Sequence, residues 1–335
     1  MNDPSHSNQK ADHCFKLSFI IPALNEAKLL ERLLLSLDQL RNTSNIIKHE
    51  VILVDAASTD GTRELALSHG CRIVDAKPGC VSASRNLGAR SASGDMIAFV
   101  DADCELPTDW LESADQQILD PTVVAIGSSM ALRDNNVSWV EKTWYALAHQ
   151  QSTNDPCSDV DWLATFNLLV KKAAFEQAGG FDETLVTCED VEFGYRLSAI
   201  GQMRRLNHCL VIHHGESQSI PEFYRREAWR ARGAITIVLK HWKNLREVIS
   251  FLMPIYIVLG FCASIILTIG VAIIQPQLLW LPLTLAVLTG PLPLTLLIVK
   301  KNIRITKYFS AMTLLSVYFY ARFIGLIRPF QRVER

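Results

Sequence analysis

Charged residues are absent from one long stretch of this 335-residue sequence, since residues 248–299 contain no Asp, Glu, Lys, Arg or His. A soluble domain has no need of so long a charge-free run, whereas a membrane-spanning helix requires about 20 apolar residues. The net charge of the whole chain is −1, so it has no basic excess to attract nucleic acid. We therefore expect a membrane-associated protein with no nucleic-acid partner.

Closely spaced cysteine pairs are also missing. The eight cysteines are scattered and include no Cys-x-x-Cys pair, which argues against a zinc cluster. The first sixteen residues are polar and lack the apolar core of an export signal. We therefore expect reduced thiols in a cytoplasmic environment rather than disulfides.

Residues 17–235 are expected to form one globular domain after a disordered tail at 1–16. Short apolar runs alternate there with segments of helical periodicity, which predicts an α/β domain with a mostly parallel sheet. Pro22 is expected to end the first strand and Asn25 to cap the following helix. The expected strands are 17–21, 51–54, 72–74 and 96–100, and the less regular second half adds helices at 139–150, 172–178 and 189–200 and a brief strand at 211–212.

The C-terminal part predicts an amphipathic juxtamembrane linker at 236–247 and a membrane region at 248–335. Basic residues flank the apolar segments on one side, which favours a hairpin with both ends in the cytoplasm. The last apolar stretch, 308–327, is either a third span or a re-entrant or interfacial helix, and the Arg residues after it favour the second reading. The two expected transmembrane helices are 249–274 and 278–299, the second kinked by Pro282, Gly290, Pro291 and Pro293.

Two carboxylates, Asp101 and Asp103, directly follow the strand at 96–100. Residues i and i+2 of an extended strand point to the same side, so these side chains are expected to converge. A divalent cation, Mg²⁺ or Mn²⁺, held together with phosphate oxygens would relieve their mutual repulsion. Ligands of parallel sheets bind beyond the carboxyl ends of the strands, where segments 22–26 and 55–60 are also expected. This pattern predicts a site for a nucleotide diphosphate.

Four motifs resemble, in order along the chain, those of the family 2 glycosyltransferases, which have the GT-A fold. They are Ile-Ile-Pro-Ala-Leu-Asn-Glu at 20–26, Val-Asp-Ala-Ala-Ser-Thr-Asp-Gly-Thr at 54–62, Ser-Arg-Asn-Leu-Gly at 84–88 and Asp-Ala-Asp at 101–103. The resemblance covers roughly residues 17–233 and implies a Rossmann-like catalytic domain, followed here by transmembrane or interfacial helices. It implies a substrate- and nucleotide-binding set of Pro22, Ala23, Asn25, Glu26, Asp55, Ser58, Asp60, Arg85, Asn86, Asp101 and Ala102. For Asp60, capping of its helix is the alternative role.

The resemblance continues at residues 179–183, which imply an acceptor-side loop, and at the catalytic carboxylates Glu189 and Asp190. It also implies that His213 joins Asp101 and Asp103 in the metal site. Asp190 is the expected general base, and repulsion from the charge of Glu189 is expected to raise its pKa. Processive members of the family carry Gln-x-x-Arg-Trp at 225–229, where only the Trp fits, so transfer of a single sugar is favoured.

Together these features predict an inverting glycosyltransferase of the hexosyltransferase type. Its donor is expected to be a nucleotide-diphosphate sugar, preferably UDP-linked, and its acceptor a lipid-linked or membrane-proximal glycan in polysaccharide or glycolipid synthesis. We expect a multi-pass protein of the cell inner (plasma) membrane, in contact with membrane lipids and with a cytoplasmic catalytic domain.

Two alternatives remain open at this point. A nucleotidyltransferase is disfavoured because residues 22–26 contain neither the Gly nor the basic residue of a phosphate loop. A catalytically inactive membrane scaffold that binds nucleotide sugars is disfavoured by the intact set of Asp101, Asp103 and Asp190.

Overall fold

The fold is seen in a computed structural model that describes residues 14–43, 45–134, 137–149 and 155–327. Most of the tail expected at 1–16 lies outside these residues. Phe15 and Lys16, which were expected in that tail, already belong to the first strand.

Nine strands form one mixed sheet in the described part of the chain, in the order β3-β2-β1-β4-β8-β6-β9-β5, with β7 added beside β9. Strands β1 to β4 pair in parallel, β8 runs antiparallel to both of its neighbours, and β6 and β9 are again parallel. Six of the nine strands, β1 to β4 with β6 and β9, therefore run in one direction, which confirms the mostly parallel α/β sheet. The strands are β1 (Phe15–Ala23), β2 (Ile46–Asp55), β3 (Arg72–Asp75), β4 (Met96–Val100), β5 (Cys104–Glu105), β6 (Val123–Ala131), β7 (Cys157–Asp159), β8 (Asn167–Lys171) and β9 (Gln202–His213).

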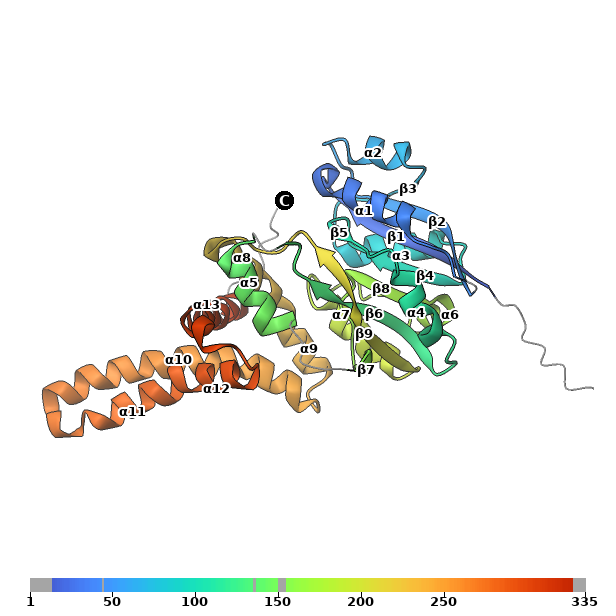
Figure 1. Ribbon diagram of the computed structural model, residues 1–335. Helices are drawn as coiled ribbons and strands as arrows, with labels where there is room; N and C mark the ends of the chain where they lie inside the picture. Colours follow the sequence, from blue (N-terminus) through green and yellow to red (C-terminus); the bar gives the residue numbers. More distant parts are fainter. Residues whose placement is uncertain (1–13, 44, 135–136, 150–154, 328–335) are drawn as a thin grey trace, which may run out of the picture.

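Helices cover both faces of this sheet (Figure 1). Phe19 of β1 packs in the same core as α1 and α4, whereas the next residue, Ile20, packs in the core of α3, α6 and α7. This alternation follows from the two-residue period of a strand and explains why six of the nine residues of β1 are buried. The helices of this part are α1 (Ala27–Gln39), α2 (Thr62–Ser68), α3 (Val81–Ser91), α4 (Trp110–Ile118), α5 (Trp139–Trp144), α6 (Lys172–Gln177), α7 (Glu189–Ser198), α8 (Ile220–Arg230) and α9 (Ala234–Lys240).

Two details at the end of β1 differ from the sequence prediction. Pro22 does not end the strand, because it still pairs with Val54 of β2. On its other side β1 pairs with β4 only from Leu17 to Ile20, so Pro22 occupies an unpaired edge, where a missing N–H is tolerated. The N-cap of α1 is Glu26 rather than Asn25.

The second half of the domain contains strands that the sequence did not suggest. Strands β6 and β8 were not predicted, and β9 has twelve residues where only 211–212 were expected. The helix expected at 139–150 ends at Trp144 and continues as one π-helical turn to His149, while residue 150 lies outside the described residues.

The C-terminal part consists of α10 (Leu245–Ile274), α11 (Trp280–Thr289), α12 (Pro291–Lys300) and α13 (Tyr308–Ile327). By length and composition, three segments of the described chain are able to cross a membrane: Leu245–Ile274, Pro276–Lys300 and Ile305–Ile327. The kink expected in the second segment is confirmed, because the helix breaks at Gly290, directly before Pro291. In Figure 1 helices α10, α11 and α12 form a long hairpin that projects away from the sheet.

These helices share a hydrophobic core with the sheet domain. Phe223 of α8 and Val140 of α5 are buried together with residues of three C-terminal helices, α10, α12 and α13. Helix α13 lies against α8 at the base of the hairpin (Figure 1). The C-terminal members of this core are Ile257, Leu294, Ile298, Ala311, Leu314, Leu315 and Phe319. The expected boundary at 236–247 therefore does not separate two independent cores.

Candidate active site

The loops that follow β1 and β2 are joined by hydrogen bonds at the carboxyl edge of the sheet. Ala56 N donates to Ala23 O at 2.9 Å, and Asn25 N donates to Ser58 Oγ at 2.9 Å. In return Asn25 Oδ1 accepts from Thr59 N at 2.9 Å. Asn25 has a φ of 58°, a left-handed conformation that Asn adopts more readily than most residues. The two segments that the sequence placed at one edge are therefore in direct contact.

Asp60 and Glu26 contribute to the same contact. Asp60 Oδ2 accepts from Ala27 N at 3.1 Å, and its Oδ1 accepts from Thr62 N at 3.1 Å. Glu26 contributes through its backbone, because Glu26 N donates to Thr62 Oγ1 at 2.8 Å. Asp60 thus holds the two loops together, and the N-cap of α2 is the next residue, Gly61.

Asp55 lies buried at the end of β2, level with Ala23 of β1. Its Oδ1 accepts from Ser58 N at 3.0 Å, and its Oδ2 is 3.6 Å from Arg63 Nη1. These contacts fix the carboxylate at the edge where the predicted nucleotide site lies. Of the two apolar residues in the predicted set, Pro22 is half-buried and Ala102 is buried.

Arg85 of α3 joins the Asp-x-Asp motif to the candidate catalytic pair. Its side chain is almost fully buried, and its Nη2 donates to Asp101 Oδ1 at 2.7 Å while its Nη1 donates to Glu189 Oε1 at 2.9 Å. Burial opposes the charge, but Asp101 and Glu189 outweigh burial and raise the pKa of Arg85. The Arg85 guanidinium therefore links the Asp-x-Asp motif to Glu189, which lies 104 residues after Arg85 in the chain.

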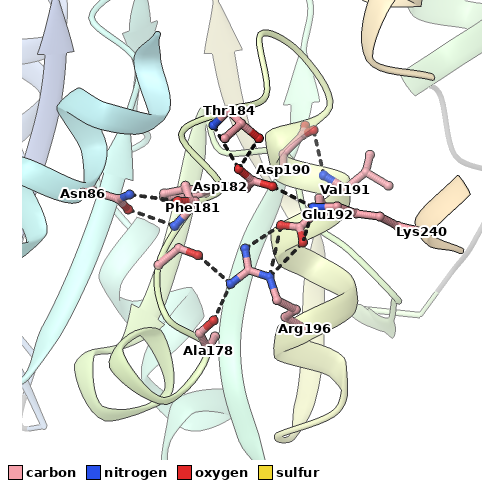
Figure 2. Close-up of polar contacts among 11 residues, drawn as sticks. Asn86, Ala178, Phe181, Asp182, Thr184, Asp190, Val191, Glu192, Arg196 and Lys240 are labelled. Carbon is pink, nitrogen blue, oxygen red and sulfur yellow. Dashed lines mark hydrogen bonds and ion pairs between the residues drawn. The ribbon is translucent and has the colours of Figure 1, made fainter. Parts of the chain in front are cut away.

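Asn86, which belongs to the predicted substrate- and nucleotide-binding set, contacts the loop at residues 179–183 (Figure 2). Its Oδ1 accepts from Phe181 N at 2.8 Å, and its Nδ2 donates to Phe181 O and to Glu183 Oε1, both at 2.9 Å. The contacts of Asn86 thus fix the backbone of residues 179–183.

A second set of charged contacts holds this loop against α7 (Figure 2). Arg196 donates to Ala178 O and, at 2.6 Å, to Gly180 O, and its Nη2 pairs with Glu192 Oε2 at 2.5 Å. Lys240 of α9 donates to Asp182 Oδ2 at 2.7 Å. The acceptor-side loop is therefore positioned by side chains from α3, α7 and α9.

Asp190 is half-buried in the first turn of α7, next to Glu189. Its Oδ1 accepts from Val191 N at 2.8 Å. Burial, followed by repulsion from Glu189, raises the pKa of Asp190 to about 7. A carboxylate with such a pKa is well suited to take a proton from a hydroxyl group at neutral pH.

Asp103 and His213 are brought together by the pairing of β5 with β9, in which Cys104 lies opposite His213. His213 Nε2 is 3.3 Å from Asp103 Oδ1. Burial raises the pKa of Asp103, while the nearby His213 moderates this shift. Asp101, which was expected to converge with Asp103, directs its Oδ1 to Arg85 instead, and it is not among the residues whose ligand atoms gather near His213.

The residues at this point fit a divalent cation. Ligand atoms of Asp103, Cys104 and His213 lie within 4.8 Å of one another. Cys104 is an unsuitable ligand for a hard cation, because its Sγ donates to Phe166 O at 3.4 Å and burial raises the pKa of its thiol well above the usual value. Carboxylate and imidazole remain, a donor set that Mn²⁺ accepts and to which diphosphate oxygens can be added.

Some residues of the site had no signal in the sequence. Glu216 lies beside His213, with 3.2 Å between its Oε1 and His213 Nδ1. Gly215 packs so tightly that a Cβ atom there would collide with Asp103 Oδ2. Neither Gly215 nor Glu216 belongs to a motif. A glycine and an acidic residue directly after two histidines are nevertheless a signal that could have indicated a tight turn around a ligand.

Comparisons with known proteins agree with this geometry. Residues 18–179 match the family described as glycosyl transferase family 2. Glycosyltransferase AglE of Haloferax volcanii is 27% identical over 252 residues, which are 73% of this chain and 81% of AglE. The pre-mycofactocin glycosyltransferase of Mycobacterium tuberculosis is also 27% identical, over 76% of this chain but only 56% of its own length.

A solved structure with the same fold is the mannosyltransferase PcManGT of Pyrobaculum calidifontis, determined in complex with GDP-Man and Mn²⁺. It aligns with a TM-score of 0.58 and 18% identity over 93% of this chain and 86% of PcManGT. The fold and the matched relatives define the chain as a glycosyltransferase. It contains a domain that matches the family 2 glycosyltransferases, with a GT-A-like fold, followed by apolar C-terminal helices.

Proposed function

We propose that this enzyme is an inverting glycosyltransferase that uses a nucleotide-diphosphate sugar, preferably UDP-linked, and transfers a single sugar to a lipid-linked or membrane-proximal acceptor. The observation that carries the proposal is the contact of buried Arg85 with both Asp101 and Glu189. Through it, the motif expected to hold the donor shares one site with Glu189, the neighbour of the expected general base Asp190.

The donor is assigned to the carboxyl edge of the sheet. Asp55 is proposed to contact the base or ribose, and the diphosphate is proposed to lie near Asp103, His213 and Arg85. A divalent cation held by Asp103 and His213 would stabilise the charge that develops on the leaving diphosphate. Arg85 offsets the negative charges of Asp101 and Glu189, which would otherwise repel the diphosphate.

The acceptor hydroxyl is proposed to lie within hydrogen-bonding reach of Asp190. As its oxygen bonds to the anomeric carbon, the bond from that carbon to the diphosphate breaks, and the hydroxyl proton passes to the Asp190 carboxylate. Attack from the side opposite the leaving group inverts the anomeric configuration. The pKa of about 7 keeps a large fraction of Asp190 ionised at neutral pH.

The membrane setting is proposed from the C-terminal helices. Helix α13 packs on α8 within a common core, so an acceptor anchored in a membrane would meet the site close to where the apolar helices join it. We propose a multi-pass protein of the inner membrane with the sheet domain in the cytoplasm, acting in polysaccharide or glycolipid synthesis. The relative named succinoglycan biosynthesis protein ExoA, from Rhizobium meliloti and 26% identical over 66% of this chain and 70% of its own length, supports this setting.

A donor screen tests the proposal. Purified full-length protein is incubated with several UDP- and GDP-sugars and Mn²⁺ or Mg²⁺, and release of the nucleoside diphosphate is measured. We expect cation-dependent release with one donor, abolished by Asp103→Asn and retained by Asp159→Asn, which alters an exposed carboxylate on β7. Full turnover in the presence of chelator would contradict the cation-dependent mechanism.

A further inference from the structure

We infer that Glu216 is a positioning residue of the cation site, whose carboxylate fixes the His213 imidazole so that Nε2 is directed at a cation bound by Asp103. The inference rests on the proposed function, because that function assigns the cation to Asp103 and His213. Glu216 itself is not proposed to touch the cation, the donor or the reacting atoms.

The geometry places the two carboxylates on opposite edges of one ring. His213 Nε2 lies 3.3 Å from Asp103 Oδ1, and His213 Nδ1 lies 3.2 Å from Glu216 Oε1. A histidine binds a metal through an unprotonated nitrogen, so ligation through Nε2 requires the ring proton on Nδ1. A carboxylate next to Nδ1 stabilises this tautomer and increases the basicity of the nitrogen that binds the metal.

Glu216 is held in a way that suits this role. It is buried, and its second oxygen, Oε2, is 3.7 Å from Arg226 Nη1 of α8. The carboxylate is therefore placed between the imidazole and a guanidinium.

The backbone around Glu216 is shaped for the same contact. His214 N donates to Asp103 O at 2.8 Å, which continues the pairing of β5 with β9 up to the turn. Gly215 then passes the Asp103 carboxylate at a distance that leaves no space for a side chain. The chain thereby returns Glu216 to the far side of the His213 ring.

The test compares Mn²⁺ binding by full-length wild-type protein and variants in detergent. The amplitude of the free Mn²⁺ signal in electron paramagnetic resonance gives the dissociation constant, with no donor or turnover involved. Nitrogen modulation of the bound Mn²⁺ signal reports ligation by imidazole. For Glu216→Gln we expect at least about tenfold weaker Mn²⁺ binding and reduced nitrogen modulation, and for Glu216→Asp, which keeps the charge, a partial recovery.

The matched control is Glu176→Gln, which removes one negative charge from an exposed position on α6 and should bind Mn²⁺ like the wild type. Circular dichroism and the thermal midpoint establish that each variant is folded. Suppose that folded Glu216→Gln binds Mn²⁺ with wild-type affinity and nitrogen modulation, while Asp103→Asn loses binding. This result would overturn the role of Glu216 and leave the cation site in place. Unchanged binding in both Asp103→Asn and His213→Ala would overturn the cation site itself and, with it, this inference.

Discussion

The two halves of the sheet domain place their functional groups by different means. In the half formed by β1 to β4, the loops after β1 and β2 are held by hydrogen bonds between neighbouring backbone and side-chain groups, as between Asn25 and Ser58. The second half is held by charged side chains that connect different elements: Arg85 of α3 reaches across from the first half to Glu189, and Arg196 of α7 binds the loop at Gly180. Among the described residues, only the second half shares a core with the apolar helices.

This difference assigns different tasks to the two halves. A rigid edge built from hydrogen-bonded loops suits the binding of a nucleotide, whose shape does not change during the reaction. The charged contacts of the second half adjust the protonation and orientation of the groups that are proposed to act on the leaving diphosphate and the acceptor. Changes in the first half should therefore act on donor KM, and changes in the second half on kcat and on stability.

The largest expected effect follows from Asp190→Asn. Loss of the general base should lower kcat by roughly 10²- to 10⁴-fold, while the KM for the donor stays near the wild-type value because the donor edge is untouched. Steady-state kinetics with donor and acceptor measure both constants. A wild-type kcat in the variant would contradict the role of Asp190 as the base. The alternative of an inactive scaffold that only binds nucleotide sugars predicts that the variant keeps its cellular role.

The junction with the apolar helices is tested by Gly325→Val on α13. A Cβ atom at residue 325 would collide with Ala228 O of α8, so the larger side chain should separate the helices and lower stability by about 1–3 kcal/mol. We expect a lower thermal midpoint in detergent and slower transfer, with donor affinity less affected. The matched control is Gly270→Val on α10, where a Cβ atom meets nothing within 4 Å, and equal behaviour of the two variants would contradict the shared core.

The pH dependence of kcat/KM is a further test of the difference between the two halves of the sheet domain. Asp190 must be ionised to accept a proton, so kcat/KM of the wild type should fall about tenfold per pH unit below a pH of about 7. The Asp190→Asn variant should lack this limb in its residual activity. A wild-type profile that stays flat down to pH 5 would show that the carboxylate is not the titrating base.

The raised pKa of Asp190 also has a consequence for stability. In the folded state its pKa is about 7 against an ordinary value of 3.8, so the stability contributed by the neutral acid is lost as the pH rises between these two values. Asp190→Asn removes this loss and should therefore be more stable than the wild type at pH 8, with a smaller difference at pH 5. Chemical unfolding at the two pH values measures it, and a variant less stable at pH 8 would contradict the raised pKa.

The smallest effect is expected from Ser58→Ala in the first half. The change removes the acceptor for Asn25 N, which should cost about 1 kcal/mol of stability and raise donor KM modestly while kcat is unchanged. Ser68→Ala, an exposed position on α2, is the control. A change in kcat without a change in KM would break the proposed division between the two halves.

The first half could be predicted from sequence because its strands and loops follow one another locally. Apolar runs bounded by Pro, Asp and Gly located β1 to β4 and the loops at their ends. Strands β6 and β8 escaped prediction because their apolar runs are short: Gly127, Ser128 and Ser129 interrupt β6, and β8 has only three apolar residues. Strand β9 escaped because Arg204, Arg205 and His208 give it a polar appearance.

The sequence predicted which residues belong to the site better than it predicted which of them contact one another. The Asp-x-Asp motif was located, but the sequence did not show that Asp101 would bind Arg85 while Asp103 lies beside His213. Both contacts depend on tertiary packing, since Arg85 comes from α3 and His213 from the end of β9. Glu216 escaped because it belongs to no motif, although it lies only three residues from His213, and its second partner, Arg226, belongs to α8.

The position of Mn²⁺ in crystals of the full-length enzyme soaked with UDP, located by anomalous scattering, tests the central claim most directly. We expect one peak within coordination distance of Asp103 and His213 Nε2, with the diphosphate oxygens completing the shell and Arg85 close to them. A peak on other residues, or a diphosphate bound away from Asp103, would contradict the assignment of this edge of the sheet to the sugar donor.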